Sequence, residues 1–165
     1  FINNKNIFPF NIAIGNNTEK KNFNFIDNSG RSSFHSSLVD NIDKIQTIEV
    51  KVDTIDNYVR KHNIEKIDLL KIDVQGFEDE VLKGASESFK LNKIAVIEIE
   101  LIIGKMYDNV LSFYDIEKII NSYGFRLFAL TNPHTYDKHS MNIIELPTMQ
   151  FDLIYVHEEK YKNYF

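Results

Sequence analysis

The sequence predicts an α/β protein, in which a β-sheet packs against helices joined to it by right-handed crossovers. Apolar segments of strand length alternate with segments of helical spacing that are about 10 to 15 residues long. Glycines stand at 15, 76 and 124, where the strands and helices of this pattern would turn. The last two apolar segments, residues 125–130 and 151–156, have a loop but no helix between them. We therefore expect them to form an antiparallel hairpin at one edge of the sheet.

The first half of the chain is expected to hold three strands and one helix. The expected strands cover residues 8–14, 23–25 and 48–52. The first is an apolar run closed by a turn, and the other two alternate apolar and polar side chains, as strands with one exposed face do. Asp53 or Thr54 can cap a helix that runs to about Lys61. The polar segment 27–37 is expected to be a loop.

The second half has a different pattern. Further strands are expected over residues 67–72 and 94–99, and helices over 76–89 and 115–123. The segment 67–72 is mostly apolar, which is typical of a strand covered on both faces. Residues 131–150, with two prolines, form the longest irregular connection and a candidate lid. Because no repeat or linker divides the chain, we expect one domain over residues 1–165.

The composition argues against several classes of protein. With 19 Lys and Arg against 24 Asp and Glu, the net charge is -5, so no nucleic-acid partner is expected. The longest apolar runs are far shorter than the ~20 residues that cross a bilayer, so no membrane partner is expected. Cysteine is absent, which excludes disulfides and thiolate metal sites and fits a reducing compartment such as the cytoplasm.

The turn after residues 67–72 carries the most informative side chains. Ligands of open α/β sheets bind beyond the carboxyl ends of the strands, so Asp73 is expected at the edge of a site. Gly76 permits a tight turn into the next helix. Glu78 and Asp79 fall in the first turn of that helix, where the helix dipole favours acids, so an ordinary structural role is the alternative for both.

Two further groups of polar residues are candidates. Glu98 and Glu100 are expected on one face of their strand, and Glu98 is the stronger candidate for a substrate ligand. In the serine-rich loop, His35 can accept a proton near neutral pH if the loop folds over the site. Ser32 and Ser33 accompany it, with turn formation as their simpler interpretation.

The long connection 131–150 contains residues that could be imagined as metal ligands. His134 and His139 flank Asp137, but their spacing matches no strong metal motif. We therefore expect a surface loop and no metal site there.

The stretch KIDVQGFE, residues 71–78, together with VLKGA at 81–85, resembles the signature of the FkbM family of S-adenosylmethionine-dependent methyltransferases. Other segments resemble the family in the same order, namely NIAIG at 11–15, GRSSF at 30–34, VDTID at 52–56, IEIE at 97–100 and YGF at 123–125. The resemblance covers most of the chain. One departure is Gln75, where the family usually has Glu.

The resemblance implies a Rossmann-like class I methyltransferase sheet, mostly parallel, with S-adenosyl-L-methionine as the cofactor. It implies that Ala13, Ile14 and Gly15 lie against the adenine and that Asp73 lies at the reaction centre, where it accepts a proton or orients the acceptor or the cofactor. His35 and Glu98 complete the expected catalytic set. The expected substrate-binding residues are Ser32, Ser33, Gly76, Glu78 and Glu98.

The family's glycine-rich cofactor turn has no counterpart in this sequence, because no two of its six glycines are close enough to form it. We expect the chain to be the C-terminal part of the family domain, with the N-terminal strands missing. The strand at 67–72 would then keep an open edge, at which a homodimer could form.

The expected activity is O-methylation of a sugar or similar hydroxyl acceptor, a substrate class inferred by analogy. Two alternatives stay open. One is a non-catalytic, degenerate methyltransferase-like module for interaction or assembly, which the missing glycine turn motivates. The other is a different α/β fold that uses Asp73 as a metal or phosphate ligand.

Overall fold

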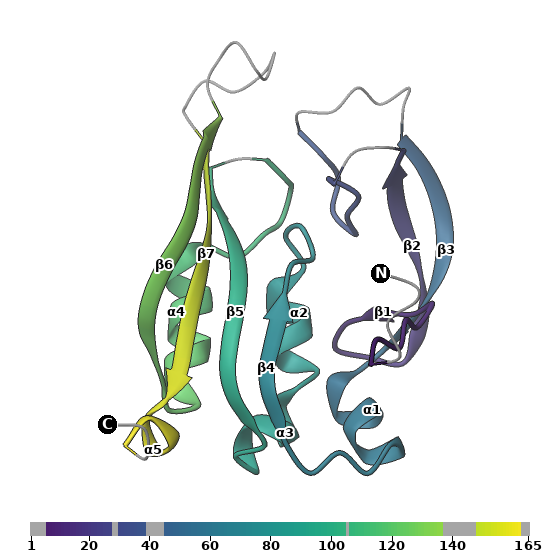
Figure 1. Cartoon of the computed structure of the whole chain (residues 1–165). Helices are drawn as coiled ribbons and strands as arrows, with labels where there is room; N and C mark the ends of the chain where they lie inside the picture. Colours follow the sequence, from purple (N-terminus) through teal and green to yellow (C-terminus); the bar gives the residue numbers. More distant parts are fainter. Residues whose placement is uncertain (1–5, 28–29, 39–44, 105, 137–147, 163–165) are drawn as a thin grey trace.

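The computed structural model describes residues 6–27, 30–38, 45–104, 106–136 and 148–162 (Figure 1). They form a mixed α/β fold with two sheets, where a single sheet was expected. The strands are β1 (Ala13–Ile14), β2 (Glu19–Ile26), β3 (Ile45–Asp53), β4 (Ile67–Ile72), β5 (Ile94–Ile103), β6 (Phe125–Tyr136) and β7 (Thr148–His157). The helices are α1 (Ile55–Lys61), α2 (Glu78–Lys83), α3 (Ser86–Lys90), α4 (Phe113–Ser122) and α5 (Glu158–Tyr161).

The smaller sheet has the strand order β1-β3-β2. β2 and β3 are antiparallel, with Glu19 opposite Val52, and β1 pairs in parallel with the end of β3. The strand expected over residues 8–14 is therefore reduced to two residues. Phe8 and Phe10 are exposed instead, and Pro9 between them has no N–H with which to join a ladder.

The larger sheet has the strand order β4-β5-β7-β6. β4 and β5 are parallel, and the expected C-terminal hairpin of β6 and β7 is confirmed. Because β7 lies between β5 and β6 and runs against both, two of the three pairings are antiparallel, so the mostly parallel arrangement is not found. The expected irregular connection is shorter than residues 131–150, since β6 continues to Tyr136 and β7 begins at Thr148.

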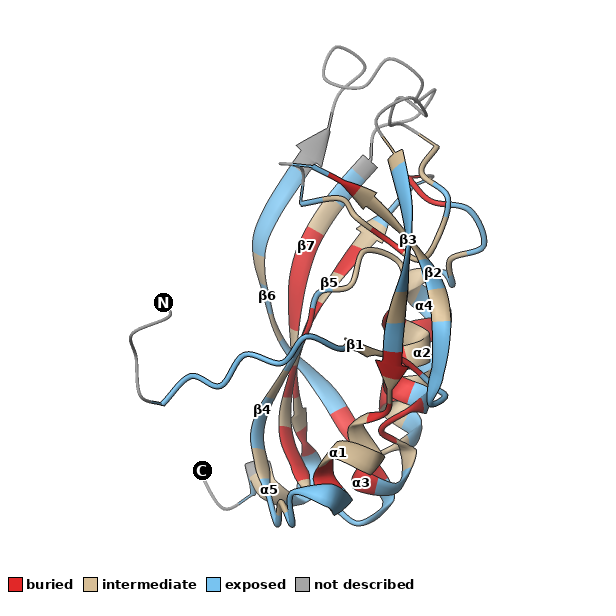
Figure 2. Ribbon diagram, turned by 90° about the vertical axis from the view of Figure 1, so that its right-hand side faces the viewer, coloured by how far each residue is buried: buried red, intermediate tan, exposed pale blue. Residues whose placement is uncertain are grey.

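Helices α2, α3 and α4 cover one face of the larger sheet, and the buried residues gather between them and the central strands (Figures 1 and 2). The core includes Val81, Leu82, Phe89, Ile97, Ile99, Ile116, Ile120, Leu153 and Tyr155. The expected helix over 76–89 is divided into α2 and α3 at Gly84. Gly84 passes the end of β1 so closely that a Cβ atom would lie 2.0 Å from the carbonyl oxygen of Gly15. This contact joins the end of β1 to the helices that cover the larger sheet.

The opposite face of the larger sheet is polar near the carboxyl ends of β4 and β5. Along β4, Leu69 is 52% exposed and Lys71 is also exposed. The prediction that this strand is covered on both faces is therefore wrong. Within the described ranges, β5 is the one strand that pairs with β4. The other edge of β4 is the open edge that the sequence predicted.

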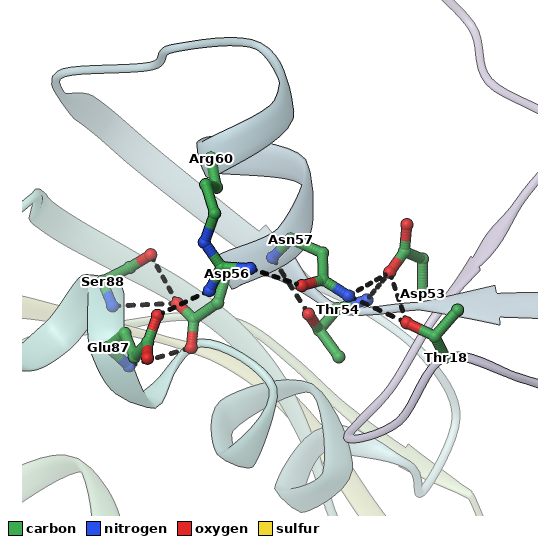
Figure 3. A network of polar contacts seen from close by, with 8 residues as sticks. All are labelled: Thr18, Asp53, Thr54, Asp56, Asn57, Arg60, Glu87 and Ser88. Atoms are coloured by element: carbon green, nitrogen blue, oxygen red, sulfur yellow. Dashed lines mark hydrogen bonds and ion pairs between the residues drawn. The ribbon is translucent and has the colours of Figure 1, made fainter.

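Helix α1 is tied to α3 by polar contacts (Figure 3). The Thr54 hydroxyl accepts the N–H of Asn57 at 3.0 Å, which confirms Thr54 as the N-cap. Asp56 accepts the N–H groups of Glu87 at 2.9 Å and Ser88 at 2.8 Å. These are the second and third residues of α3, whose own N-cap is Ala85 and offers no side-chain oxygen. Asp56 therefore caps α3 from another helix.

The helices of the described residues are short. None has the length and apolar character of a membrane span. Helix α4 begins at a capping box in which Ser112 and Asp115 satisfy each other's backbone N–H groups. Its C-cap is Tyr123, and Gly124 follows with a φ of 82°. The helix expected over residues 115–123 is therefore present, but it starts two residues earlier and ends one residue earlier.

Candidate functional site

The turn between β4 and α2 brings the signature residues to the carboxyl end of the larger sheet. Asp73 directly follows β4, and Gln75 and Gly76 both have a positive φ, at 53° and 98°. A Cβ atom on Gly76 would also lie 2.7 Å from the Val110 side chain. Glycine is therefore required at 76 by its backbone conformation and by its contact.

Glu78 is a buried acid and belongs to the turn itself. Glu78 is only 7% exposed, and its Oε1 accepts the N–H of Gly76 at 2.9 Å. Burial raises the pKa of Glu78 to about 7. Asp79 has the ordinary role, because it pairs with Lys83 at 2.7 Å one turn along the helix.

Four carboxylates share the helix-free face at this end of the sheet, namely those of Asp73, Glu98, Glu100 and Asp152. Glu98 and Glu100 share a face, as predicted, and Glu100 lies opposite Asp152 of β7. Lys71 is the cation among them, with Nζ 3.0 Å from Glu98, 3.5 Å from Asp152 and 3.9 Å from Asp73. The face is strongly acidic overall, which favours cationic groups of a ligand.

Glu100 is more enclosed than a solvated strand end would be. Its carboxylate accepts N–H groups from the amides of Gln75, at 2.6 Å, and Gln150. The same Gln75 nitrogen lies 3.3 Å from Asp73, and the Gln75 oxygen accepts the hydroxyl of Tyr107 at 2.9 Å. Burial and the nearby Asp73 raise the pKa of Glu100.

The serine-rich loop is anchored to the turn. Ser33 is completely buried; its hydroxyl donates to the Gln75 carbonyl at 2.6 Å and accepts the N–H of His35 at 3.0 Å. The Tyr107 hydroxyl, which donates to the Gln75 side chain, also lies 3.2 Å from the carbonyl of Arg31 in the same loop. Ser33 therefore anchors this loop beside the turn that follows Asp73.

His35 lies beside the turn. Its ring centroid is 5.8 Å from that of Phe77, and a Cβ atom on Gly76 would be 3.5 Å from its Cδ2. Burial lowers the pKa of His35, so its ring is neutral at pH 7. A neutral ring nitrogen is able to accept a proton.

A groove of about 650 Å³ adjoins the turn through Tyr107. Its walls include Leu38, Val110, Leu111, Phe113 and Tyr114. This volume is in the range of small-molecule sites, and the walls are mostly apolar.

A comparison with family models decides the classification of the chain. The model of the methyltransferase FkbM domain matches residues 2–127, most of the chain. This chain belongs to the FkbM methyltransferase family. No curated protein and no solved structure matches it.

Gly76 and Glu78 lie together with Ser33 and His35, and Asp73 precedes them directly after β4. Ser32 lies in the same loop, where its hydroxyl accepts the N–H of Ile26 at 3.0 Å. Their expected roles toward substrate stay predictions, because the observed contacts of Ser32, Ser33 and Glu78 are with the chain's own backbone.

The segment expected to contact the adenine of the cofactor, residues 13–15, lies in and directly after β1 of the smaller sheet. Ala13 and Ile14 form β1 and are partly buried, and Gly15 donates its N–H to the carbonyl of Asp53 at 2.9 Å. Gly15 also packs against Val52 and Phe77. The contact with Phe77 connects this segment to the turn after β4.

Of the imagined metal ligands, His134 lies on β6 opposite Gln150, and Asp137 and His139 lie outside the described residues. Sequence reasoning missed Tyr107, Gln150 and Asp152. Asp152 had a signal, because it alternates with Phe151 and Leu153 along an otherwise apolar strand. Tyr107 and Gln150 had none.

Proposed function

We propose that this FkbM domain is an S-adenosyl-L-methionine-dependent methyltransferase that methylates a hydroxyl of a sugar or similar acceptor. Family membership supports methyl transfer, and the observation that carries the site assignment is the position of Asp73 at the acidic end of β4 and β5. The substrate class rests on analogy.

The donor set on this face fits a positively charged cofactor. S-adenosyl-L-methionine, when bound, supplies a methyl group on a cationic sulfur, and it carries an ammonium group. Asp73, Glu98 and Asp152 offer carboxylate oxygens, of which only part is neutralised by Lys71. Ala13, Ile14 and Gly15 would contact the adenine.

A hydroxyl that becomes an ether loses its proton, so the site needs a base. Asp73 is our first candidate, since it lies at the strand end, where an acceptor would be bound. His35 is the second, because its neutral ring lies next to Gly76. The groove beside Tyr107 offers space for the acceptor.

The test is transfer of a radiolabelled methyl group from S-adenosyl-L-methionine to a panel of glycans and simple polyols. We expect D73N to lower the rate by about 100-fold or more, the lower end of the effect of a general base. D68N is the matched control, because Asp68 lies on β4 but is 80% exposed at its side chain and pairs with Lys66. Full activity in D73N would overturn the assignment of Asp73, and no transfer with any acceptor would count against the proposed function.

A further inference from the structure

Gln75 has an unusual backbone conformation for its residue type. Its φ of 53° is positive, which a residue with a side chain adopts at a cost. Asparagine tolerates this region better than most residues. Every other residue of the described ranges that has a positive φ and is not glycine is an asparagine, namely Asn63, Asn92, Asn109 and Asn132. The backbone therefore gives no preference for glutamine at position 75, which points to a role of its side chain.

Both ends of the Gln75 amide are in use. The Tyr107 hydroxyl donates to its oxygen at 2.9 Å. Its nitrogen lies 2.6 Å from Oε2 of Glu100 and 3.3 Å from Oδ1 of Asp73. A glutamate in this place would have no N–H to offer these two acids and would add a further negative charge beside them. A neutral amide is therefore suited to this place where a carboxylate is not.

Asp73 is held more loosely than the other carboxylates of this face. The Gln75 nitrogen lies 3.3 Å from its Oδ1, and the Lys71 ammonium lies 3.9 Å from its Oδ2. Its side chain is 41% exposed. Each of the other three carboxylates has a nitrogen partner within 3.0 Å; they belong to Glu98, Glu100 and Asp152. Gln75 and Lys71 thus orient Asp73 from two sides and leave it able to accept a hydrogen bond from a ligand.

We propose that Gln75 is a positioning residue, whose amide, held by Tyr107, orients the carboxylate of Asp73 toward the ligand. The inference rests on the proposed function, in which Asp73 is the first candidate for the base. Tyr107 is only 4% exposed and also lines the groove that offers space for the acceptor. The contacts from Tyr107 through Gln75 to Asp73 therefore connect the wall of this groove to the base.

The test is a double-mutant cycle of methyl-transfer rates with Q75N and D73N. Asparagine keeps the amide and suits the positive φ, but its side chain is one methylene shorter, so the contacts with both Tyr107 and Asp73 are not kept. We expect Q75N to lower kcat by about tenfold or more in the wild-type background, as for a lost hydrogen bond to a charged group. In the D73N background it should lower kcat by less than about twofold, because the residue through which Gln75 acts is already gone.

Q46N is the matched control, because Gln46 is an exposed residue of β3, and it should leave kcat unchanged. Urea denaturation checks that each variant is folded. If Q75N lowered kcat by the same factor in both backgrounds, Gln75 would act on the fold or through Glu100, and the positioning role would be overturned.

A second readout needs neither cofactor nor acceptor. In the ligand-free chain labelled with ¹⁵N, the NMR signals of the Gln75 side-chain NH₂ group report its hydrogen bonds. We expect D73N and Y107F each to shift these signals, whereas D68N, at an exposed position of the same strand, leaves them as in the wild type. Signals that D73N leaves unchanged would overturn the inference.

The two readouts separate this inference from the proposed function. Shifted Gln75 signals in D73N without methyl transfer to any acceptor would support the orientation of Asp73 by Gln75 and remove the proposed function. Methyl transfer in which Q75N has equal effects in both backgrounds would keep the proposed function and overturn the positioning role.

Discussion

Glu78 lies in the interior of the fold although its place in the sequence is that of an ordinary first-turn helix acid. Its carboxylate accepts the N–H of Gly76 and so closes the turn that follows Asp73. The cost is a carboxylate held away from water, which raises its pKa from 4.5 to about 7. Between these two pH values the folded chain binds more protons than the unfolded chain.

The free energy of unfolding should therefore fall as pH rises through this window, by about 3 kcal/mol from Glu78 alone. In E78Q this pH dependence disappears. From pH 4.5 to 8 the free energy of unfolding of E78Q should therefore rise by about 3 kcal/mol relative to that of the wild type. Urea denaturation across this pH range measures it. E65Q, at an exposed position, is the control. A difference that stays constant with pH would contradict the account.

Several features of single residues could be predicted from the sequence. Asp73 follows its strand as expected, and Glu98 and Glu100 share a face because side chains alternate along a strand. Their partners could not be predicted, since the contact of Glu100 with Gln150 depends on the register of β5 against β7. Glu98 was expected to be the better ligand, but it is paired with Lys71.

At the scale of elements, α3 depends on an acid from α1. Replacing Asp56 by Ala removes the acceptor of the N–H groups of Glu87 and Ser88 and of the Ser88 hydroxyl. We expect D56A to lower the free energy of unfolding by about 1 to 2 kcal/mol, the usual range for a lost cap. K61A, on the exposed last turn of α1, should change it by less than about 0.5 kcal/mol. Denaturant titration compares the two, and equal effects would contradict the cap.

The sequence predicted most elements but not their interruptions. Thr54 was recognised as a possible cap because Ser and Thr favour that position. Gly124 was expected to be the C-cap of α4, but the C-cap is Tyr123 and Gly124 is the residue after it. The division between α2 and α3 could not be recognised, because it is caused by the close approach of Gly84 to Gly15, residues far apart in the sequence. The same limit applies to Asp56, whose partners lie in another helix.

At the scale of the whole molecule, the smaller sheet packs against helix α2 of the larger one, where Gly15 contacts both Gly84 and Phe77. Strand periodicity indicates the strands but gives neither their order nor the number of sheets, so the single sheet expected from sequence was wrong. The position of β7 between β5 and β6 likewise depends on contacts between residues far apart in the sequence. Among the described residues β4 pairs with β5 alone, so its other edge is open there, and the homodimer expected at it stays a prediction.

We propose that the acidic end of β4 and β5 binds S-adenosyl-L-methionine. Calorimetric titration of S-adenosylhomocysteine into the chain, and into the complete product of its gene where that is longer, tests it most directly. We predict binding that weakens by about tenfold or more in D73N, as expected for a lost charged contact, and that is unchanged in D68N. Absence of binding to either protein, or equal affinity in D73N and the wild type, would contradict the account.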